Sequence, residues 1–391
     1  MKIAFFVSTV LEYGGGLEKY YIETASKLAE DPLNQVDIIS LDDNFSIRLT
    51  TGLSAFYFKK IDPKLYFKES SQNIKDKLKD AHYHKVSLGK LRPTLQEYDV
   101  IYSKNELLEA TILKLYVGYK HLPPVVFGGH TALQYPNATS LHAKLHNYLY
   151  GGGLYKFLAS GVSRFHVLNG AEEAAYRRLF PSKPVYKIYN PFDSKAFRQQ
   201  AHEYPYTLKN LDHHNINILW LGRLTEQKGV KDLSQIIEYI NKYSSSFVRP
   251  VSWTIVGDGE LRYVVDDLAT KYTNVATIGH IDQKYTASIY SAHDIFISTS
   301  KWEGYPYTLL EAISCKLDIV SYAIPGPLDI LSVYKKGHIA KNRQDIEKEL
   351  LKVVKYLQDN SSEKVDDPTQ FKPEKIYADL LAMLKYEEIK K

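Results

Sequence analysis

The chain has 391 residues and a net charge of +5, and its hydrophobic content of 44% and charged content of 24% are values of globular proteins. This composition excludes a disordered chain, and the length exceeds one ordinary core, so we expect two domains. The single cysteine, Cys315, excludes an intramolecular disulfide and fits a reducing compartment. The opening apolar run is too short to span a membrane and lacks a cleavage-type small-residue site, so it predicts a buried strand.

The first half of the chain alternates short apolar runs with helical patterns. This alternation predicts a parallel sheet covered by helices. The expected strands are residues 2–9, 35–41, 99–103, 124–128, 164–168 and 185–189.

Two features of the first half follow expected strands. Gly14, Gly15 and Gly16 precede a helical pattern, and such a loop can direct N–H groups at a phosphate. A plain turn explains it about as well, because the GxGxxG spacing is absent. His130 comes just past a strand end, which would place its imidazole at the ligand-binding edge of the sheet, although a lone histidine is more often structural.

Basic and aromatic residues are concentrated in 57–92. Residues 59–92 contain ten Lys or Arg against four Asp or Glu. The segment would suit contact with anionic lipid or an acidic acceptor, and a solvated lysine-rich helix and loop is an equally good interpretation. No nucleic-acid-binding motif accompanies it, so we expect no nucleic-acid partner.

The second half repeats the alternation after a polar segment. Residues 196–215 form the expected linker. Helical patterns at 342–358 and 373–389 close the chain, and a second doubly wound domain follows from strands expected at 216–223, 251–257, 275–279, 294–299 and 318–323.

Two turns of the second half suit a nucleotide. Arg223 and Lys228 flank the turn GRLTEQKG at a helix start, and two cations there would neutralise a diphosphate. Gly257, Asp258 and Gly259 follow the next strand, where glycines permit close backbone approach to a ligand, although such a turn is common.

The stretch EGYPYTLLE, residues 303–311, joins two carboxylates to a helix start. Gly304 permits close approach, Pro306 suits the first position of a helix, and Glu311 falls on the second turn. Unpaired N–H groups at the helix start can hold phosphate, and Glu303 and Glu311 can accept hydroxyl hydrogen bonds. The pattern predicts a phosphorylated, hydroxyl-rich ligand such as a sugar nucleotide.

The paired histidines do not predict a metal site. His82 with His84, and His213 with His214, have no accompanying cysteine or acidic ligand set. We interpret them as surface residues and expect no structural metal.

Three motifs of the second half, in order, resemble the donor domain of glycosyltransferase family 4, whose members are retaining enzymes of GT-B architecture. GRLTEQKG resembles the family's GRLxxEKG turn, VGDGELR its GxGPLR turn, and EGYPYTLLEA its EGFPLxLLEA signature. In the first half, GGGLEKY resembles the Gly-Gly-x-Glu loop and YNPFDSKAF the NGVDxxxF stretch. The resemblance covers nearly the whole chain, and the unmatched residues 45–95 and 131–160 would be acceptor-side segments.

The resemblance implies an α/β, GT-B fold of two doubly wound Rossmann-like domains with an interdomain cleft. The implied division is an acceptor-binding domain at 1–195, the linker at 196–215, and a nucleotide-sugar donor-binding domain at 216–372, with a final helix at about 373–391 packing back on the first domain.

The resemblance also implies roles for individual residues. Arg223 and Lys228 would hold the donor diphosphate, Glu311 the ribose, Glu303 the donor sugar hydroxyls, and His130 would contact the transferred sugar. The catalytic set is then His130, Glu303, Arg223 and Lys228. Further donor contacts would come from Gly14, Gly15, Gly16, Gly257, Asp258, Gly259, Gly304, Tyr305, Pro306, Tyr307 and Thr308.

The sequence departs from the family's pattern at two places. Lys316 stands where the family has a helix-ending glycine, which would cost about 1 kcal/mol if the left-handed conformation is kept. Pro325, Gly326 and Pro327 replace a Gly-Gly loop, so the donor sugar is harder to predict.

The function expected from the resemblance is a hexosyltransferase-type enzyme. It would transfer a sugar with retention from a UDP- or GDP-sugar to an acceptor hydroxyl of a glycan, lipid-linked sugar or glycoprotein glycan. A front-face, metal-independent mechanism is expected, with no cofactor, in the cytoplasm or peripherally at the inner membrane face through residues 57–92. A GT-B sugar-nucleotide epimerase and a non-catalytic GT-B partner subunit remain alternatives.

Overall fold

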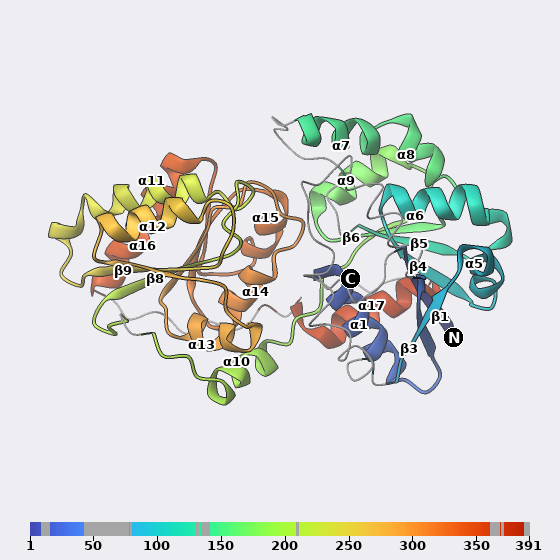
Figure 1. The fold of residues 1–391 in the computed structure, drawn as a ribbon, viewed down its shortest axis with the longest axis horizontal. Helices are drawn as coiled ribbons and strands as arrows, with labels where there is room; N and C mark the ends of the chain where they lie inside the picture. The colour runs from blue at the N-terminus through green and yellow to red at the C-terminus, as the bar shows by residue number, and fades with distance from the viewer. Residues whose placement is uncertain are drawn as a thin grey trace. The chain divides into compact units, whose positions relative to one another are not determined.

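The computed structural model describes residues 1–8, 16–42, 78, 80–129, 133, 141–208, 211–359, 368 and 371–386. The chain divides into two compact units. The first is Met1–Asn190 together with the chain from Glu374 onward, and the second is Pro191–Pro373. Each unit is a parallel sheet flanked by helices (Figure 1).

The first unit contains a seven-stranded sheet in the order β3-β2-β1-β4-β5-β6-β7. The strand order reverses between β1 and β4, which both pair in parallel with neighbours, so this is a doubly wound sheet. The strands are β1 (Lys2–Val7), β2 (Gln35–Leu41), β3 (His82–Val86), β4 (Val100–Lys104), β5 (Val125–Gly129), β6 (Arg164–Val167) and β7 (Val185–Lys187).

The two faces of this sheet bury separate apolar clusters. Along β1, Ala4 and Phe6 enter one cluster, and Ile3 and Phe5 enter the other, because successive side chains of a strand point to opposite faces. The helices are α1 (Gly16–Ala29), α5 (Leu88–Leu95), α6 (Leu107–Thr111), α7 (Leu141–Gly151), α8 (Gly153–Leu158), α9 (Gly170–Leu179) and α17 (Pro373–Lys385), with the π-helical turn η2 (Ile112–Val117) and the 3-10 turn η3 (Tyr119–His121).

Helix α17 belongs to the first unit although it closes the chain. Ile376, Leu380 and Met383, spaced three and four residues apart, are buried in the same cluster as Phe5. Arg164 on β6 donates from Nη2 to the carbonyl of Leu384 at 2.6 Å. Burial of each such side chain stabilises the unit by roughly 1.5–3 kcal/mol, so the helix is held by packing.

The second unit contains a six-stranded parallel sheet in the order β10-β9-β8-β11-β12-β13. Here the order reverses between β8 and β11. The strands are β8 (Ile216–Leu221), β9 (Val251–Val256), β10 (Val275–Ile278), β11 (Ile295–Ser298), β12 (Asp318–Tyr322) and β13 (Gly337–Ala340).

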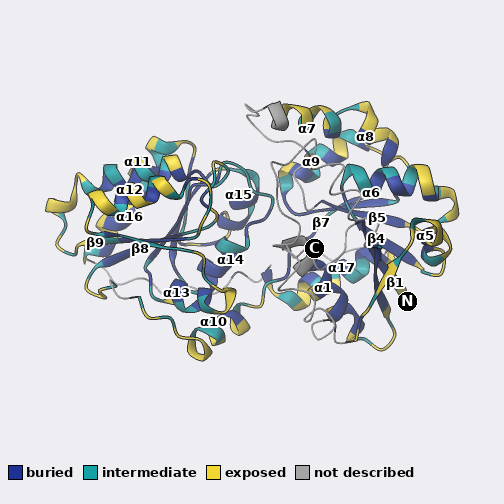
Figure 2. Ribbon diagram, viewed as in Figure 1, coloured by how far each residue is buried: buried dark blue, intermediate teal, exposed yellow. Residues whose placement is uncertain are grey.

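Helices α11, α12 and α16 cover one face of this sheet. On α11 the buried residues Leu233, Ile236, Ile237 and Ile240 recur at the helical period. Figure 2 shows the strands buried beneath helices whose outer positions are exposed. The helices are α10 (Ser194–Glu203), α11 (Val230–Asn241), α12 (Arg262–Lys271), α13 (Thr286–Ser291), α14 (Tyr307–Ser314), α15 (Pro325–Leu331) and α16 (Arg343–Asp359), with the 3-10 turns η4 (Ser244–Ser246) and η5 (Gln283–Tyr285).

Every strand expected from the sequence is found within two residues of its predicted ends, but β3 and β13 were not predicted. Both lie at sheet edges. The sequence of β3, HYHKV, is polar and partly exposed, so it lacks the apolar run that marks a central strand. His82 and His84 on β3 are exposed, as expected, and face the buried Asp37 of β2, with 3.2 Å between His82 Nδ1 and Asp37 Oδ1.

The segment predicted as a linker, 196–215, begins with most of helix α10, and the units divide after Asn190. Phe197 on α10 is buried, with its ring centroid 6.1 Å from that of Tyr290 on α13. Arg198 Nη1 donates to the carbonyl of Ser314 at 3.0 Å. The helix is therefore part of the second unit. Its polar sequence predicted a linker because, of residues 194–203, Phe197 alone is buried.

Helix α14 ends at a left-handed lysine. Lys316 has φ 65°, its N–H donates to the Ile313 carbonyl at 2.9 Å, and the N–H of Leu317 donates to the Ala312 carbonyl at 3.2 Å. These two bonds are the Schellman pattern, which requires the left-handed residue. The conformation expected for a family glycine is thus adopted here by lysine.

Within the described ranges, no helix combines the length and apolar character needed to cross a membrane.

Candidate functional site

A cavity of about 670 Å³ opens in the second unit at the carboxyl ends of β8 and β9. In an open parallel sheet this edge, near the reversal of strand order, is where ligands bind. Its lining comes from the end of β8, the turn after β9, the loop after β10, and helices α13 and α14: Leu221, Gly222, Arg223, Val256, Gly257, Asp258, His280, Ile281, Asp282, Gln283, Thr286, Thr308 and Glu311.

Five residues singled out from the sequence line this cavity: Arg223, Gly257, Asp258, Thr308 and Glu311. They come from three motifs separated by up to 88 positions, the distance from Arg223 to Glu311. The sheet topology brings the motifs together because each follows a strand of the same parallel sheet.

Lys228 and Glu303 form an ion pair beside this region. Lys228 Nζ donates to Glu303 Oε1, and the two side chains are only 18% and 13% exposed. Partial burial lowers the local dielectric and strengthens the attraction between the charges. Each charge also makes the other less costly to bury, so removing one would leave its partner uncompensated.

The turn after β8 is joined to the loop after β11 around this pair. The N–H of Lys301 donates to the Gln227 carbonyl at 2.8 Å, and Gln227 Nε2 donates to the Trp302 carbonyl at 3.3 Å. Gln227 Oε1 also accepts from Arg223 Nη2 at 3.3 Å. One glutamine therefore links the exposed Arg223 guanidinium to the loop that carries Glu303.

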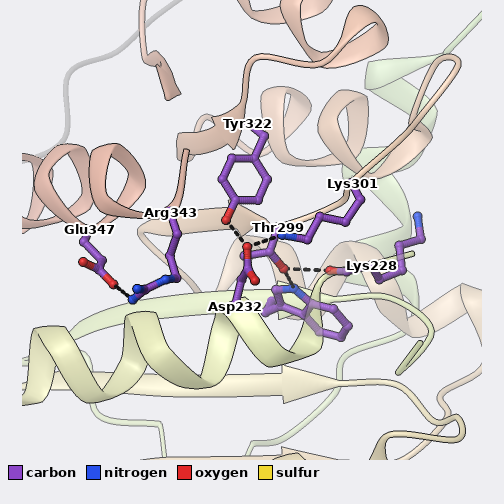
Figure 3. A network of polar contacts seen from close by, with 8 residues as sticks. Lys228, Asp232, Thr299, Lys301, Tyr322, Arg343 and Glu347 are labelled. Atoms are coloured by element: carbon purple, nitrogen blue, oxygen red, sulfur yellow. Dashed lines mark hydrogen bonds and ion pairs between the residues drawn. The ribbon is translucent and has the colours of Figure 1, made fainter. Parts of the chain in front are cut away.

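Gly229 allows this close approach. Its φ is +69°, and a Cβ added there would lie 2.0 Å from the Thr299 carbonyl oxygen. A larger residue would push the start of α11 away from the end of β11. Thr299 Oγ1 donates to the Lys228 carbonyl at 2.7 Å and accepts from Trp220 Nε1 at 2.9 Å, which fixes the backbone at Lys228 (Figure 3).

Asp232 on α11 supports the loop after β11, which carries Lys301 and Glu303. Its carboxylate accepts from Lys301 Nζ and from the Tyr322 hydroxyl of β12 (Figure 3). Burial, and then Asp232, raise the pKa of the Tyr322 phenol well above its usual value, so the phenol stays a donor. The Lys301 ammonium lies 4.9 Å from the Tyr322 ring centroid. This network positions the backbone two residues before Glu303.

Gly257 and Gly259 meet protein backbone at close range. A Cβ on Gly257 would lie 1.9 Å from the Gly222 carbonyl oxygen, and one on Gly259 would lie 2.6 Å from the Leu224 carbonyl oxygen. We expected these glycines to permit approach of a nucleotide. The structure adds a packing role for both, because they let the turn after β9 contact the turn after β8. Gly257 also lines the cavity, and contact of these glycines with a nucleotide stays a prediction.

The EGYPYTLLE stretch leads into α14 as expected, with one shift. Pro306 is the N-cap of the helix, one position before the predicted one. Tyr305 is buried, with its ring centroid 6.4 Å from that of Phe371, and Tyr307 and Thr308 are half-buried in the first turn. Pro306 has no N–H to donate, so its place at the cap leaves no extra orphan donor.

Gly326 packs against the Glu303–Gly304 backbone. A Cβ on Gly326 would lie 2.5 Å from the Gly304 carbonyl oxygen. Pro325 begins α15. The Pro-Gly-Pro sequence thus keeps a small residue where the two loops meet.

Glu311 lies on the second turn of α14, only 8% exposed, with its side chain in the cavity lining. The Tyr290 phenol lies beside it. Burial first, and then the Glu311 carboxylate, raise the pKa of Tyr290 well above its usual value. Glu311 is therefore a buried acceptor at the edge of an open cavity.

The loop after β10 was missed by sequence reasoning. His280, Ile281, Asp282 and Gln283 line the cavity, and Asp282 Oδ1 accepts from the Lys284 N–H at 3.0 Å. The available signal was position alone, since these residues directly follow the predicted strand at 275–279.

Several predicted residues lie outside the described ranges. Gly14, Gly15 and His130 are among them, together with residues 57–77 of the basic and aromatic segment. Gly16 is the first residue of α1.

The first unit has a buried polar cluster where its own strand order reverses. The Ser8 N–H, just past β1, donates to Glu109 Oε1 at 3.0 Å, and Lys104 Nζ lies 3.2 Å from the same oxygen. Glu109 is fully buried, and burial raises its pKa although Lys104 opposes the shift. Among the described residues, Glu109 Oε2 and the Asn105 amide are buried without a hydrogen-bond partner. In the part of the chain described, no His, Cys, Asp and Glu group could hold a metal ion.

The paired doubly wound units define the class of protein: the fold is GT-B. HepE of Anabaena, solved in complex with UDP, has the same fold, with a TM-score of 0.67 and 16% identity over 99% of this chain and 100% of that chain. At this identity the likeness is one of fold.

The second unit matches a known family model. Residues 209–372 match the model described as glycosyl transferases group 1. One component of human phosphatidylinositol N-acetylglucosaminyltransferase is 29% identical over 123 residues, 30% of this chain and 24% of that protein. An uncharacterized glycosyltransferase of Methanocaldococcus jannaschii is 34% identical over 119 residues, 28% and 27% of the two chains. The chain thus spans about a quarter of the length of these curated relatives.

Proposed function

We propose that the protein is a retaining glycosyltransferase of the hexosyltransferase type, which transfers a sugar from a nucleotide-diphosphate sugar to an acceptor hydroxyl. The proposal rests on one observation, which is that three sequence motifs lie around one cavity. Arg223 and Glu311 line it, and the Lys228–Glu303 pair lies on the turn and loop next to it. Cations for a diphosphate and carboxylates for sugar hydroxyls are the groups that a sugar nucleotide requires.

The donor is a UDP- or GDP-sugar. HepE, which shares the fold, has been solved with UDP and with UDP-glucose, and this supports a uridine nucleotide. In our assignment Glu311 accepts from the ribose hydroxyls, and Arg223 and Lys228 contact the diphosphate. Glu303 accepts from hydroxyls of the donor sugar. The backbone from Gly304 to Thr308 adds donors at the start of α14.

The proposed chemistry is a front-face displacement. The acceptor oxygen forms a bond to the anomeric carbon on the face from which the nucleotide diphosphate leaves, and the acceptor proton passes to an oxygen of the departing phosphate. Glu303 is paired with a lysine, which stabilises its charge and makes it a poor nucleophile. Arg223 and Lys228 stabilise the charge that develops on the leaving group, and so no metal is required.

The acceptor would bind to the first unit, which we assign as the acceptor domain, with the second unit as the donor domain. We propose a glycan, a lipid-linked sugar or a glycoprotein glycan as acceptor, and a cytoplasmic protein with peripheral membrane contact through 57–92. His130 would contact the transferred sugar, and Gly14 to Gly16 a phosphate oxygen. The human phosphatidylinositol N-acetylglucosaminyltransferase component supports a lipid-linked acceptor by its name.

The test is a thermal-shift screen of the full chain against nucleoside diphosphates and their sugars. A ligand at one hundred times its Kd stabilises the folded state by roughly 2.7 kcal/mol, a readily measured shift. We expect one nucleotide family to raise the Tm of the parent and to lose its effect in Arg223→Ala and in Glu311→Ala.

Arg178→Ala and Glu349→Ala are matched controls, because both residues lie on helices outside the cavity lining. These variants should respond as the parent does. No shift for any donor at saturating concentration would favour a non-catalytic GT-B partner. Conversion of one sugar nucleotide to another without acceptor would identify an epimerase.

A further inference from the structure

The first unit exposes a group of large apolar side chains on α7, α8 and η2. Tyr148 is 77% exposed, Phe157 54% and Leu154 50%. Single exposed apolar side chains are common on proteins, but a group of large ones on neighbouring elements is unusual. We call this group the exposed apolar face: Leu115, Tyr116, Leu145, Tyr148, Leu154 and Phe157.

Helix α8 packs against α7 and is contacted by η2, so the three elements are neighbours in the fold. Helices α7 and α8 are separated only by Gly152, where an added Cβ would lie 2.7 Å from the Tyr148 carbonyl oxygen. On η2, Lys114 Nζ lies 4.9 Å from the Phe157 ring centroid and donates to Ser160 Oγ at 2.9 Å. Figure 1 shows α7 and α8 end to end along one border of the unit.

The inner sides of the same helices already fill the core. Tyr150 on α7 and Tyr155 on α8 are buried, with ring centroids 5.3 Å apart. Leu113 and Val117 on η2 enter the same cluster. The exposed apolar face is therefore additional to the core packing, and a second apolar side on a surface helix indicates a binding partner.

In the sequence around these elements, the charged side chains are all basic. No aspartate or glutamate occurs between Glu109 and Glu172. Glu109 itself is fully buried. Lys144 on α7 and Lys156 on α8 are exposed, and so is Lys120 on η3, which follows η2 in the chain.

We propose that the exposed apolar face binds an anionic lipid bilayer. Tyrosine, phenylalanine and leucine side chains would enter the boundary between headgroups and acyl chains, and the lysines would pair with lipid phosphates while their methylene stems lie along apolar surface. Charge complementarity selects this partner. Protein interfaces are depleted in lysine, which is costly to desolvate, whereas a bilayer surface leaves the ammonium group in water.

The proposal does not rest on the glycosyltransferase assignment, because binding to vesicles requires neither donor nor acceptor. It also differs from contact through 57–92, since its residues lie on α7, α8 and η2. The two surfaces can be distinguished by substitution.

The experiment is co-sedimentation of the full chain with vesicles of phosphatidylcholine containing phosphatidylglycerol, and with vesicles of phosphatidylcholine alone. Binding is expected for the anionic vesicles and should weaken as salt is raised. Lys144→Ser with Lys156→Ser should weaken binding roughly fivefold per lysine. Tyr148→Ser with Phe157→Ser should weaken it at least tenfold, given the apolar area that two aromatic side chains bury.

The controls change similar residues elsewhere. Lys348→Ser with Lys355→Ser alters exposed lysines of α16, and Tyr263→Ser with Val248→Ser alters side chains that are 65% and 86% exposed in the second unit. These variants should bind as the parent does, and circular dichroism verifies the fold of every variant. Failure of the parent to bind anionic vesicles at low salt overturns the proposal. So does unchanged binding by the α7 and α8 variants, which would assign the contact to another segment such as 57–92.

Discussion

Lys316→Gly should stabilise the second unit without touching the cavity. The residue ends α14 in the left-handed region, at φ 65°, and both Schellman hydrogen bonds depend on that conformation. The Lys316 carbonyl also accepts from Lys336 Nζ at 2.5 Å, and Lys336 lies 3.0 Å from the buried Asp318. These hydrogen bonds hold residue 316 in the left-handed conformation, which is strained for a lysine because it has a Cβ.

The magnitude follows from two opposing terms. A non-glycine residue in the left-handed region costs about 1–2 kcal/mol because its Cβ crowds the backbone. Glycine removes this strain but loses about 0.4–1 kcal/mol more backbone entropy on folding. The carbonyl that accepts from Lys336 is present in both. We expect a net gain of about 0.5–1 kcal/mol, which corresponds to a rise in Tm of about 1–4 °C for a unit of this size.

Calorimetry of the parent, Lys316→Gly and Lys316→Ala measures this directly. Alanine removes the same side-chain atoms beyond Cβ and keeps the strain, so it controls for contacts of the lysine side chain. The glycine variant should melt above the alanine variant, and donor binding should be equal in all three. Equal stability of glycine and alanine would refute the reasoning, because it would show that the left-handed conformation carries no net cost here.

Three further outcomes are expected. Lys228→Ala should lower turnover by roughly 10–100-fold, since a charge-assisted bond contributes about 1.5–3 kcal/mol, and steady-state kinetics within twofold of the parent would contradict its role. Glu109→Gln should gain stability relative to the parent as pH rises. Burial raises the pKa of Glu109 in the folded protein above its usual value of 4.5. The folded parent is therefore most stable at acid pH, where Glu109 is protonated, and it loses stability as pH rises through the raised pKa. Melting curves from acid to neutral pH test this. Gly257→Ala should destabilise the second unit by roughly 2–4 kcal/mol, because the added Cβ would lie 1.9 Å from the Gly222 carbonyl oxygen. Gly89→Ala is the control and should not destabilise the protein, because the space around Gly89 is open. Chemical denaturation measures the free energy of unfolding of both variants.

The periodic parts of the fold were predictable from the sequence. The buried strands of both sheets appear as apolar runs because a parallel strand is covered on both faces. The strands β3 and β13 were missed because they are only partly covered. Part of their surface faces solvent, so their sequences lack a continuous apolar run. Helix α10 was missed because its polar sequence looks like a linker, although its buried Phe197 packs against the second unit.

The site was predictable as motifs and not as contacts. Arg223 and the turn at Gly257 could be selected because each directly follows a predicted strand, and Glu311 because it lies on the helix that the EGYPYTLLE stretch begins. The carboxyl ends of parallel strands meet at one edge of the sheet, which brings these motifs together. That Lys228 pairs with Glu303 could not be read from the sequence, since 75 positions separate them. The packing role of Gly257 was equally invisible, because it depends on where the Gly222 backbone passes.

The sequence by itself determined the alternation of strand and helix, the resemblance to a GT-B glycosyltransferase, and the residue types available for a sugar nucleotide. These properties are local, and depend on the pattern of neighbouring side chains. Only the tertiary structure decided that Asp232, Lys301 and Tyr322 support the loop carrying Glu303, that the loop at 280–283 lines the cavity, and that α7 and α8 keep apolar side chains exposed. Burial and contact between distant residues depend on how the elements pack, which no local pattern specifies.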